Sequence, residues 1–178
     1  MDALDVLEQQ HQHVSELLGR IATEPSPGSR TAMVARLVRL IDAHSRCEER
    51  LFYPLLAERL GKSSDRCQID EGRYYRACEE HAMARYTARQ LLHTRVTDVR
   101  FEARLALVRK TFLDHAEDEE DWLFQKAKRD LTDEQLDIIG DELVHAFDAH
   151  MRASEPSRLR IARHPGRPRA RTRPRLAA

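Results

Sequence analysis

The stretch that decides the fold is residues 37–56, "LVRLIDAHSRCEERLFYPLL". At helical spacing its apolar stripe runs through a histidine and a glutamate: Leu37, Ile41, His44, Glu48, Leu51 and Leu55. A helix buries the side chains that share such a stripe, so we expect an ionisable pair in the core, one turn apart. We also expect Leu51 and Leu55 to continue the buried stripe beyond the glutamate.

Three other segments each place one histidine on an apolar stripe. The stripes are Leu4, Leu7, His11, Val14, Leu18 and Ile21; Tyr74, Ala77, His81, Ala84, Ala88 and Leu91; and Phe101, Leu105, Val108, Phe112, His115, Glu119 and Trp122. Two of the four sites have the order His-x-x-x-Glu followed by a second acid, as "HSRCEE" and "HAEDEE". A single such histidine is most simply a packed core imidazole.

The four histidines together indicate a metal site. No lysine or arginine lies on these stripes, so two buried carboxylates would cost several kcal/mol each unless a cation neutralised them. The candidate ligands are the six ionisable residues on the stripes: His11, His44, Glu48, His81, His115 and Glu119.

The composition of the 178-residue chain favours one helical domain, since 34% of residues are charged, 6% are aromatic and only 6 are glycine. Periodicity predicts helices over about residues 2–23, 31–60, 64–96, 98–129 and 133–151. Thr132 and Gln135 form a capping box before the last of these. We therefore expect an all-α, up-down-up-down four-helix bundle with an additional C-terminal helix.

The C-terminal segment differs from the body of the chain. Residues 152–178 contain nine arginines and one acid, so the tail carries +8 and residues 1–151 carry −8. We expect a metal-binding domain over 1–151 and a disordered basic tail over 152–178, because the tail has little to bury. The tail could bind nucleic acid through phosphates, and "GRPR" at 166–169 resembles the core of an AT-hook. The alternatives are loose contact with the acidic body and a role in solubility alone.

The sequence also favours a cytoplasmic location. It has no apolar run long enough to span a membrane, and its acidic start is unlike a signal peptide. Three cysteines without zinc-type spacing argue against a disulfide framework. We expect Cys47 and Cys78, which neighbour the candidate ligands, to be buried inert thiols.

The donor set suits iron or manganese, because it combines imidazole with carboxylate and lacks thiolate. Four histidines and two glutamates exceed the needs of one ion, whereas two six-coordinate ions offer about twelve positions. Two bridging carboxylates and a bridging oxygen would leave about two of these positions open. The sequence thus predicts a dinuclear centre with room for a small ligand.

The motifs "HQHVSELL", "HSRCEERLFYP", "EEHAMA" and "HAEDEEDWLF" resemble those of the hemerythrin-like family, the HHE cation-binding domains, over about residues 2–150. The resemblance implies a four-helix bundle with a non-haem di-iron centre that binds O2 or responds to oxygen, iron or nitric oxide. By position, the four histidines resemble terminal ligands, and Glu48 and Glu119 resemble bridging ligands. Oxygen-carrying members have a second histidine where this chain has Ala77. That departure favours sensing, peroxide or NO chemistry, or iron handling over reversible O2 carriage.

Several alternatives stay open. Tyr74 could approach the vacant position or simply pack in the core, and His13 is the alternative to His11. Glu49 and Glu120 are expected outside the ligand set. The function is either binding or sensing of a gaseous or peroxide ligand, or an enzyme that reduces O2 or disproportionates peroxide. We favour binding or sensing, because Tyr74 is the sole dedicated proton donor on the stripes.

Overall fold

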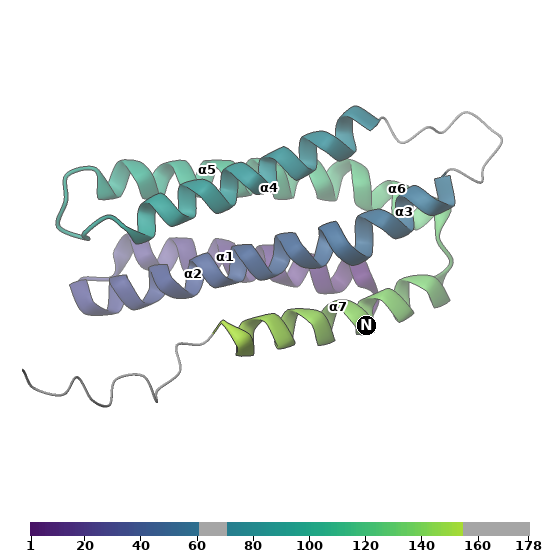
Figure 1. Cartoon of the computed structure of the whole chain (residues 1–178), viewed down its shortest axis with the longest axis horizontal. Helices are drawn as coiled ribbons and strands as arrows, with labels where there is room; N and C mark the ends of the chain where they lie inside the picture. Colours follow the sequence, from purple (N-terminus) through teal and green to yellow (C-terminus); the bar gives the residue numbers. More distant parts are fainter. Residues whose placement is uncertain (61–70, 155–178) are drawn as a thin grey trace, which may run out of the picture.

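The computed structural model describes residues 1–60 and 71–154, and every element in these ranges is helical (Figure 1). The elements are α1 (Ala3–Thr23), α2 (Pro27–Cys47), η1 (Glu48–Phe52), α3 (Tyr53–Leu60), α4 (Glu71–Leu92), α5 (Phe101–Asp118), η2 (Glu119–Leu123), α6 (Phe124–Asp130) and α7 (Asp133–Ala153). The chain runs without a break through α2, η1 and α3, and again through α5, η2 and α6. The all-α prediction is confirmed.

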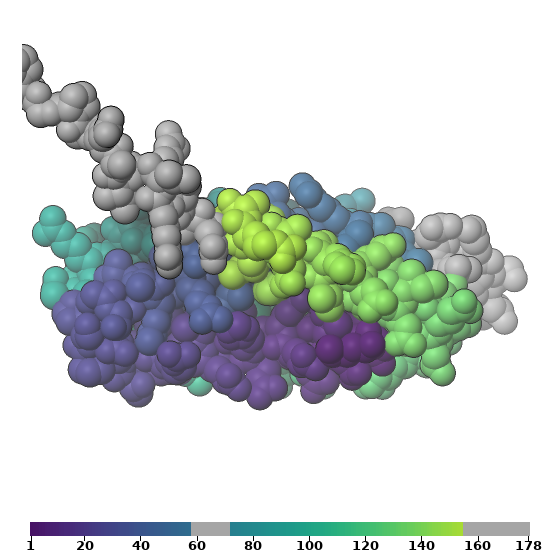
Figure 2. All heavy atoms as spheres, turned by 90° about the horizontal axis from the view of Figure 1, so that it is seen from below, coloured from purple at the N-terminus to yellow at the C-terminus, as the bar shows by residue number. Residues whose placement is uncertain are grey.

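The two continuous helices and α1 and α4 form a four-helix bundle. In it α1 packs on α2, α2 on α4, α4 on α5 and α5 on α1. The α1–α2 and α4–α5 connections lie at the same end, as an up-down-up-down order requires (Figure 1). Helix α7 lies outside the bundle along α1 and α2 (Figure 2). In the part of the chain that the structure describes, no helix is long and apolar enough to cross a membrane.

Several predicted boundaries were wrong. The second helix begins at Pro27, not residue 31, because Ser26 caps it through the backbone N–H of Ser29 and proline suits the first turn. The third helix ends at Leu92, and its predicted start near residue 64 lies outside the described residues. The fourth helix begins at Phe101, not residue 98.

The predicted fifth helix is capped by the expected box between Thr132 and Gln135. It extends two residues past 151, to Ala153. The rest of the basic tail, from residue 155, lies outside the described residues.

Two apolar cores flank the middle of the bundle. One contains Leu18, Ile21, Leu37, Leu40 and Phe101, and the other contains Leu4, Leu7, Phe52, Leu56 and Phe124. On α1 and on α2 a histidine separates residues of the two cores: His11 lies between Leu7 and Val14, and His44 lies between Ile41 and Cys47. Burial stabilises each large apolar side chain by roughly 1.5–3 kcal/mol, so the two cores can hold a polar layer between them.

Two π-helical turns start at the two candidate glutamate ligands. At the end of η1 the N–H of Tyr53 donates to the carbonyl of Glu48, and at the end of η2 the N–H of Phe124 donates to Glu119. Each bond spans five residues, where an α-helix spans four, so each turn contains one extra residue. Such turns are frequently found at functional sites.

The extra residues rotate the apolar stripe that follows each glutamate. Beyond Glu48 the buried side chains are those of Phe52, Tyr53 and Leu56, whereas Leu51 and Leu55 are only partly buried. Beyond Glu119 the buried aromatic is Phe124, and Trp122 is partly buried. The predicted stripes were therefore wrong after each glutamate and right before it.

Candidate metal centre

Each helix of the bundle contributes a histidine to one buried layer, and each π turn contributes a glutamate. All six side chains are nearly inaccessible to solvent. Their donor atoms form two overlapping groups, with all atoms of a group within 4.8 Å of one another: His11, His44, His115 and Glu119; and His44, Glu48, His81 and His115. The structure thus brings together all six residues that the sequence indicated.

Each glutamate lies between histidines of different helices. Glu48 Oε2 is 2.9 Å from His81 Nε2 and 3.2 Å from His44 Nε2. Glu119 Oε2 is 3.4 Å from His11 Nε2 and 3.6 Å from His115 Nε2. A carboxylate with two oxygens in such a position can contact two cations at once.

The other nitrogen of each imidazole contacts an oxygen outside the layer. The Nδ1 contacts are His11 with Glu120 at 2.7 Å, His44 with Gln10 at 3.1 Å, His81 with Glu49 at 3.1 Å and His115 with Glu80 at 3.3 Å. Ionised carboxylate and amide oxygens only accept hydrogen bonds, so Nδ1 carries the hydrogen in each contact. The lone pair of a neutral ring is then on Nε2, which faces the layer, as in histidines that bind metals.

Several buried atoms of this layer have no hydrogen-bond partner among the described residues. They are Nε2 of His11 and His44 and both carboxylate oxygens of Glu48 and Glu119. His81 Nε2 and His115 Nε2 are only 2.9 Å apart, so a proton or a cation must lie between their lone pairs. A buried polar atom without a partner costs about 1–3 kcal/mol. The donor set therefore fits bound cations.

The electrostatics of the layer also favour bound positive charge. Burial lowers the pKa of His11, but Glu119 and Glu120 outweigh burial and raise this pKa to about 9. Burial likewise lowers the pKa of His115, but the nearby carboxylates of Glu48, Glu80 and Glu119 outweigh burial and raise this pKa to about 10. Two carboxylates thus attract cations or protons into a space that water hardly reaches.

The structure also places the alternative candidates. His13 is half-buried, and its Nε2 lies 3.0 Å from Arg36, away from the layer. Glu49 and Glu120, expected outside the ligand set, contact the Nδ1 atoms of His81 and His11. Burial raises the pKa of Cys47 to about 12, so this thiol stays protonated as expected for an inert buried cysteine.

The tyrosine nearest the layer is Tyr53, which the sequence did not indicate. Its ring stacks on His81 at a centroid distance of 5.7 Å, and its side chain is 2% exposed. Its hydroxyl has no hydrogen-bond partner among the described residues. Tyr74 is partly buried and contacts Tyr53 edge to face at 5.8 Å. Without the π turn, Tyr53 would lie off the buried stripe, which is why periodicity did not reveal it.

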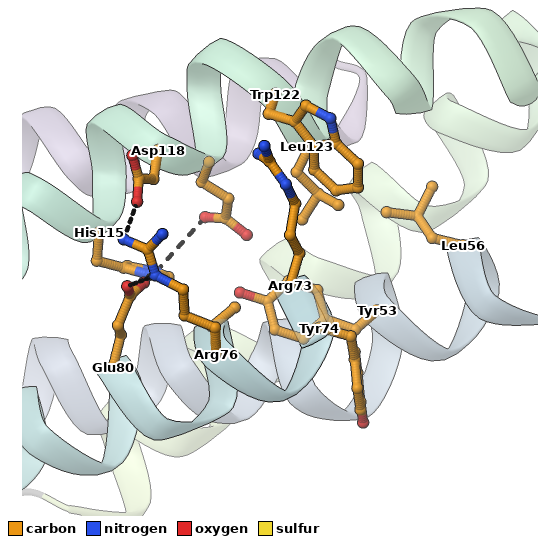
Figure 3. A pocket seen from close by; sticks show the side chains of 12 residues that line it. Tyr53, Leu56, Arg73, Tyr74, Arg76, Glu80, His115, Asp118, Trp122 and Leu123 are labelled. Atoms are coloured by element: carbon orange, nitrogen blue, oxygen red, sulfur yellow. Dashed lines mark hydrogen bonds and ion pairs between the residues drawn. The ribbon is translucent and has the colours of Figure 1, made fainter. Parts of the chain in front are cut away.

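A pocket leads from the surface to this layer between α4 and the α5–η2–α6 helix (Figure 3). Its volume is about 550 Å³ including the open mouth. Its walls are formed by Tyr53, Leu56, Arg73, Tyr74, Arg76, Ala77, Glu80, His115, Asp118, Glu119, Trp122 and Leu123. Ala77, where the resemblance implied a missing histidine, thus lines the same pocket as His115 and Glu119.

A bundle with a histidine from each helix and two inward glutamates defines a cation-binding helical protein. Residues 2–127 match the hemerythrin HHE cation binding domain, and the chain belongs to that family. Its fold is similar to the crystal structure of a hemerythrin HHE cation binding domain-containing protein from Mycobacterium kansasii, with a TM-score of 0.72 and 21% identity. That match covers 86% of this chain and 89% of the other. No curated protein matches the sequence.

Proposed function

We propose that this protein holds two non-haem iron ions and uses them to bind or sense a small ligand such as O2, NO or peroxide, or to handle iron. One observation supports this above all others. Four imidazole Nε2 atoms and two carboxylates face one another in a buried layer, and most of these atoms lack a partner among the described residues. Family membership supports cations in this place.

The distances suggest how the residues share two ions. His11 and His44 would hold one ion, His81 and His115 the other, and Glu48 and Glu119 would bridge them. An iron pair supplies reversible redox change and open coordination positions for small ligands. Mixed imidazole and carboxylate donors suit iron, and the four Nδ1 contacts keep the rings oriented for it.

An enzyme that reduces O2 or disproportionates peroxide is the second candidate, and Tyr53 is the observation that favours it. Burial, together with the nearby Glu119 and Glu48 carboxylates, raises the pKa of Tyr53 well above its ordinary value. Its hydroxyl therefore keeps its proton at neutral pH. Tyr53 lines the same pocket as Ala77, where it could donate that proton to a bound ligand.

The test is to load the purified chain with iron without oxygen, to count the iron, and to record spectra before and after adding air, NO and peroxide. Two iron ions per chain and a stable spectral change support binding or sensing. Repeated turnover with gas release supports the enzyme. Fewer than one iron per chain, with tighter binding of zinc, would contradict both candidates.

Two further proposals concern the rest of the protein. Free Cys47 and Cys78 are consistent with a reducing cytoplasm, which we propose as the location of the protein.

We also propose that the arginine-rich segment 152–178 binds nucleic acid or another polyanion. DNA titration of the full chain and of a chain ending at Met151 tests this. Equal binding by both, or none by either at low salt, contradicts the proposal.

A further inference from the structure

Aromatic side chains cover the buried layer on the side of His11 and His44. His11 stacks on Phe124 at a centroid distance of 6.0 Å, and Phe112 packs edge-on against both His11 and His44, at 5.9 and 5.6 Å. The pocket instead lies beside α4, and its lining includes His115 and Glu119 of the layer together with Ala77 of α4. Figure 3 shows His115 from the side of this pocket. A ligand that follows this pocket reaches His115, which together with His81 would hold one of the two proposed ions.

Two arginine side chains of α4 cross the mouth of the pocket. Arg76 Nη2 lies 2.5 Å from Asp118 Oδ2, and Arg76 Nε lies 2.7 Å from Glu80 (Figure 3). One turn earlier, the Arg73 guanidinium lies over the Trp122 ring at 4.6 Å from its centroid. Both arginines are exposed, so these contacts can open without any shift of the helices.

The two arginines differ in charge balance. Two acids neutralise Arg76, whereas Arg73 contacts no acidic side chain among those whose positions the structure describes. Among the described side chains, the positive charge of Arg73 at the mouth of the pocket is therefore not offset by an acid. This charge matters because residues 1–151 carry a net charge of −8, which would otherwise repel an anion.

We propose that this pocket is the site for the external ligand, that the ligand binds at the metal position held by His81 and His115, and that Arg73 and Arg76 are positioning residues at its mouth. The ligand class is small inorganic molecules of two or three atoms, with anions favoured by Arg73. The inference rests on the proposed metal pair. It adds the side from which a ligand reaches the metal pair, the metal position at which the ligand binds, and the preference of the pocket for anions.

The first test needs no metal. Trp122 is the chain's single tryptophan and lies at the pocket mouth, so its fluorescence reports on this place alone. In metal-free protein, Arg73→Ala should reduce quenching by iodide about twofold, because a local cation concentrates anions, and should not reduce quenching by neutral acrylamide. Arg109→Ala, which removes an exposed arginine of α5 outside the pocket, is the matched control. Equal iodide quenching in Arg73→Ala and the parent would overturn the charge preference.

The second test measures azide association with the iron-loaded protein by its absorbance change. Ala77→Phe should fill the pocket and slow association about tenfold or more, and Ala103→Phe, on the exposed side of α5, should not. Arg73→Glu leaves the inner pocket intact and should also slow azide about tenfold, with much less effect on NO. Unchanged azide rates in both Ala77→Phe and Arg73→Glu would overturn the inference. A parent that holds no iron would instead contradict the proposed function, and the fluorescence test would still decide the charge preference.

Discussion

The two halves of the candidate metal centre each contain two imidazoles, in different surroundings. In the α1–α2 half, the Nδ1 of His44 contacts the neutral amide of Gln10. The Nδ1 of His11 contacts Glu120, which pairs with no arginine in the described part of the chain. Aromatic rings cover this half, as the contacts of Phe112 and Phe124 show.

The α4–α5 half is built from charged chains of contacts. His81 contacts Glu49, which lies 2.8 Å from Arg85. His115 contacts Glu80, which lies 2.7 Å from Arg76. Both arginines are on α4, which also carries Ala77 in place of a further donor. Each half contributes two histidines, but in the α4–α5 half both of them contact a carboxylate that is itself paired with an arginine, and His115 of this half lines the pocket.

The largest effect is expected from removing one histidine in each half. His44→Ala and His115→Ala should each lower bound iron, and should destabilise the loaded protein by about 3 kcal/mol or more, because metal binding and folding are coupled. His44→Ala should cost more, since His44 is completely buried, whereas water from the pocket can reach the space left by His115. Iron analysis and thermal unfolding measure both effects. The exposed His145→Ala is the control, and unchanged iron in both site variants would show the site to be misassigned.

A second prediction separates a metal centre from an ordinary buried polar cluster. Glu119→Gln keeps the shape of the side chain and removes its negative charge. Burial and repulsion from the Glu48 carboxylate disfavour that charge in the metal-free protein, and they raise the pKa of Glu119. The metal-free variant should therefore be about 1–2 kcal/mol more stable than the metal-free parent, and the iron-loaded variant less stable than the iron-loaded parent. Denaturant unfolding with and without iron measures this reversal. A loss of stability in both states would mean that the carboxylate has a structural role without metal.

A third prediction tests the difference between the halves directly. Glu80→Ala removes a charged acceptor from His115, and Gln10→Ala removes a neutral one from His44. Loss of such an outer contact typically weakens metal binding about 10–100-fold. Glu80→Ala should be near the upper end because it removes the charged acceptor that links His115 to Arg76. Competition with a chelator gives both affinities. Equal losses would show that the charged contacts do not distinguish the halves.

The sequence predicted the parts of the centre that depend on helical periodicity alone. His11, His44, His81 and His115 lie on their stripes, and the order His-x-x-x-Glu places each glutamate one turn beyond its histidine. Burying a carboxylate without a lysine or arginine on the same stripe is costly in free energy. This cost, in addition to the spacing, indicated that the two glutamates neutralise a bound cation.

The parts beyond each glutamate could not be predicted in the same way. A π turn adds one residue to a helix, and no local residue type in "EERLF" or "EEDWL" specifies it. Periodicity therefore placed Leu51 and Trp122 in the core, where the structure has Phe52 and Phe124. The pocket and the contacts of Glu80 also depend on which helices become neighbours, which a single sequence does not contain.

Tyr53 is the residue most affected by that missing turn, and it gives the smallest predicted effect. Tyr53→Phe removes a buried hydroxyl that has no partner among the described residues, so the metal-free variant should be equal in stability to the parent or up to about 1 kcal/mol more stable. In the iron-loaded protein, the expected effect is on peroxide turnover. If the hydroxyl supplies a proton to a ligand in the α4–α5 half, which the pocket reaches, turnover should fall while the iron content stays the same. Stopped-flow absorbance and denaturant unfolding measure the two effects, with the exposed Tyr86→Phe as control. A metal-free variant that is clearly less stable than its parent would mean that the hydroxyl supports the fold. Unchanged peroxide turnover would mean that this hydroxyl is not the proton donor that an enzyme would need.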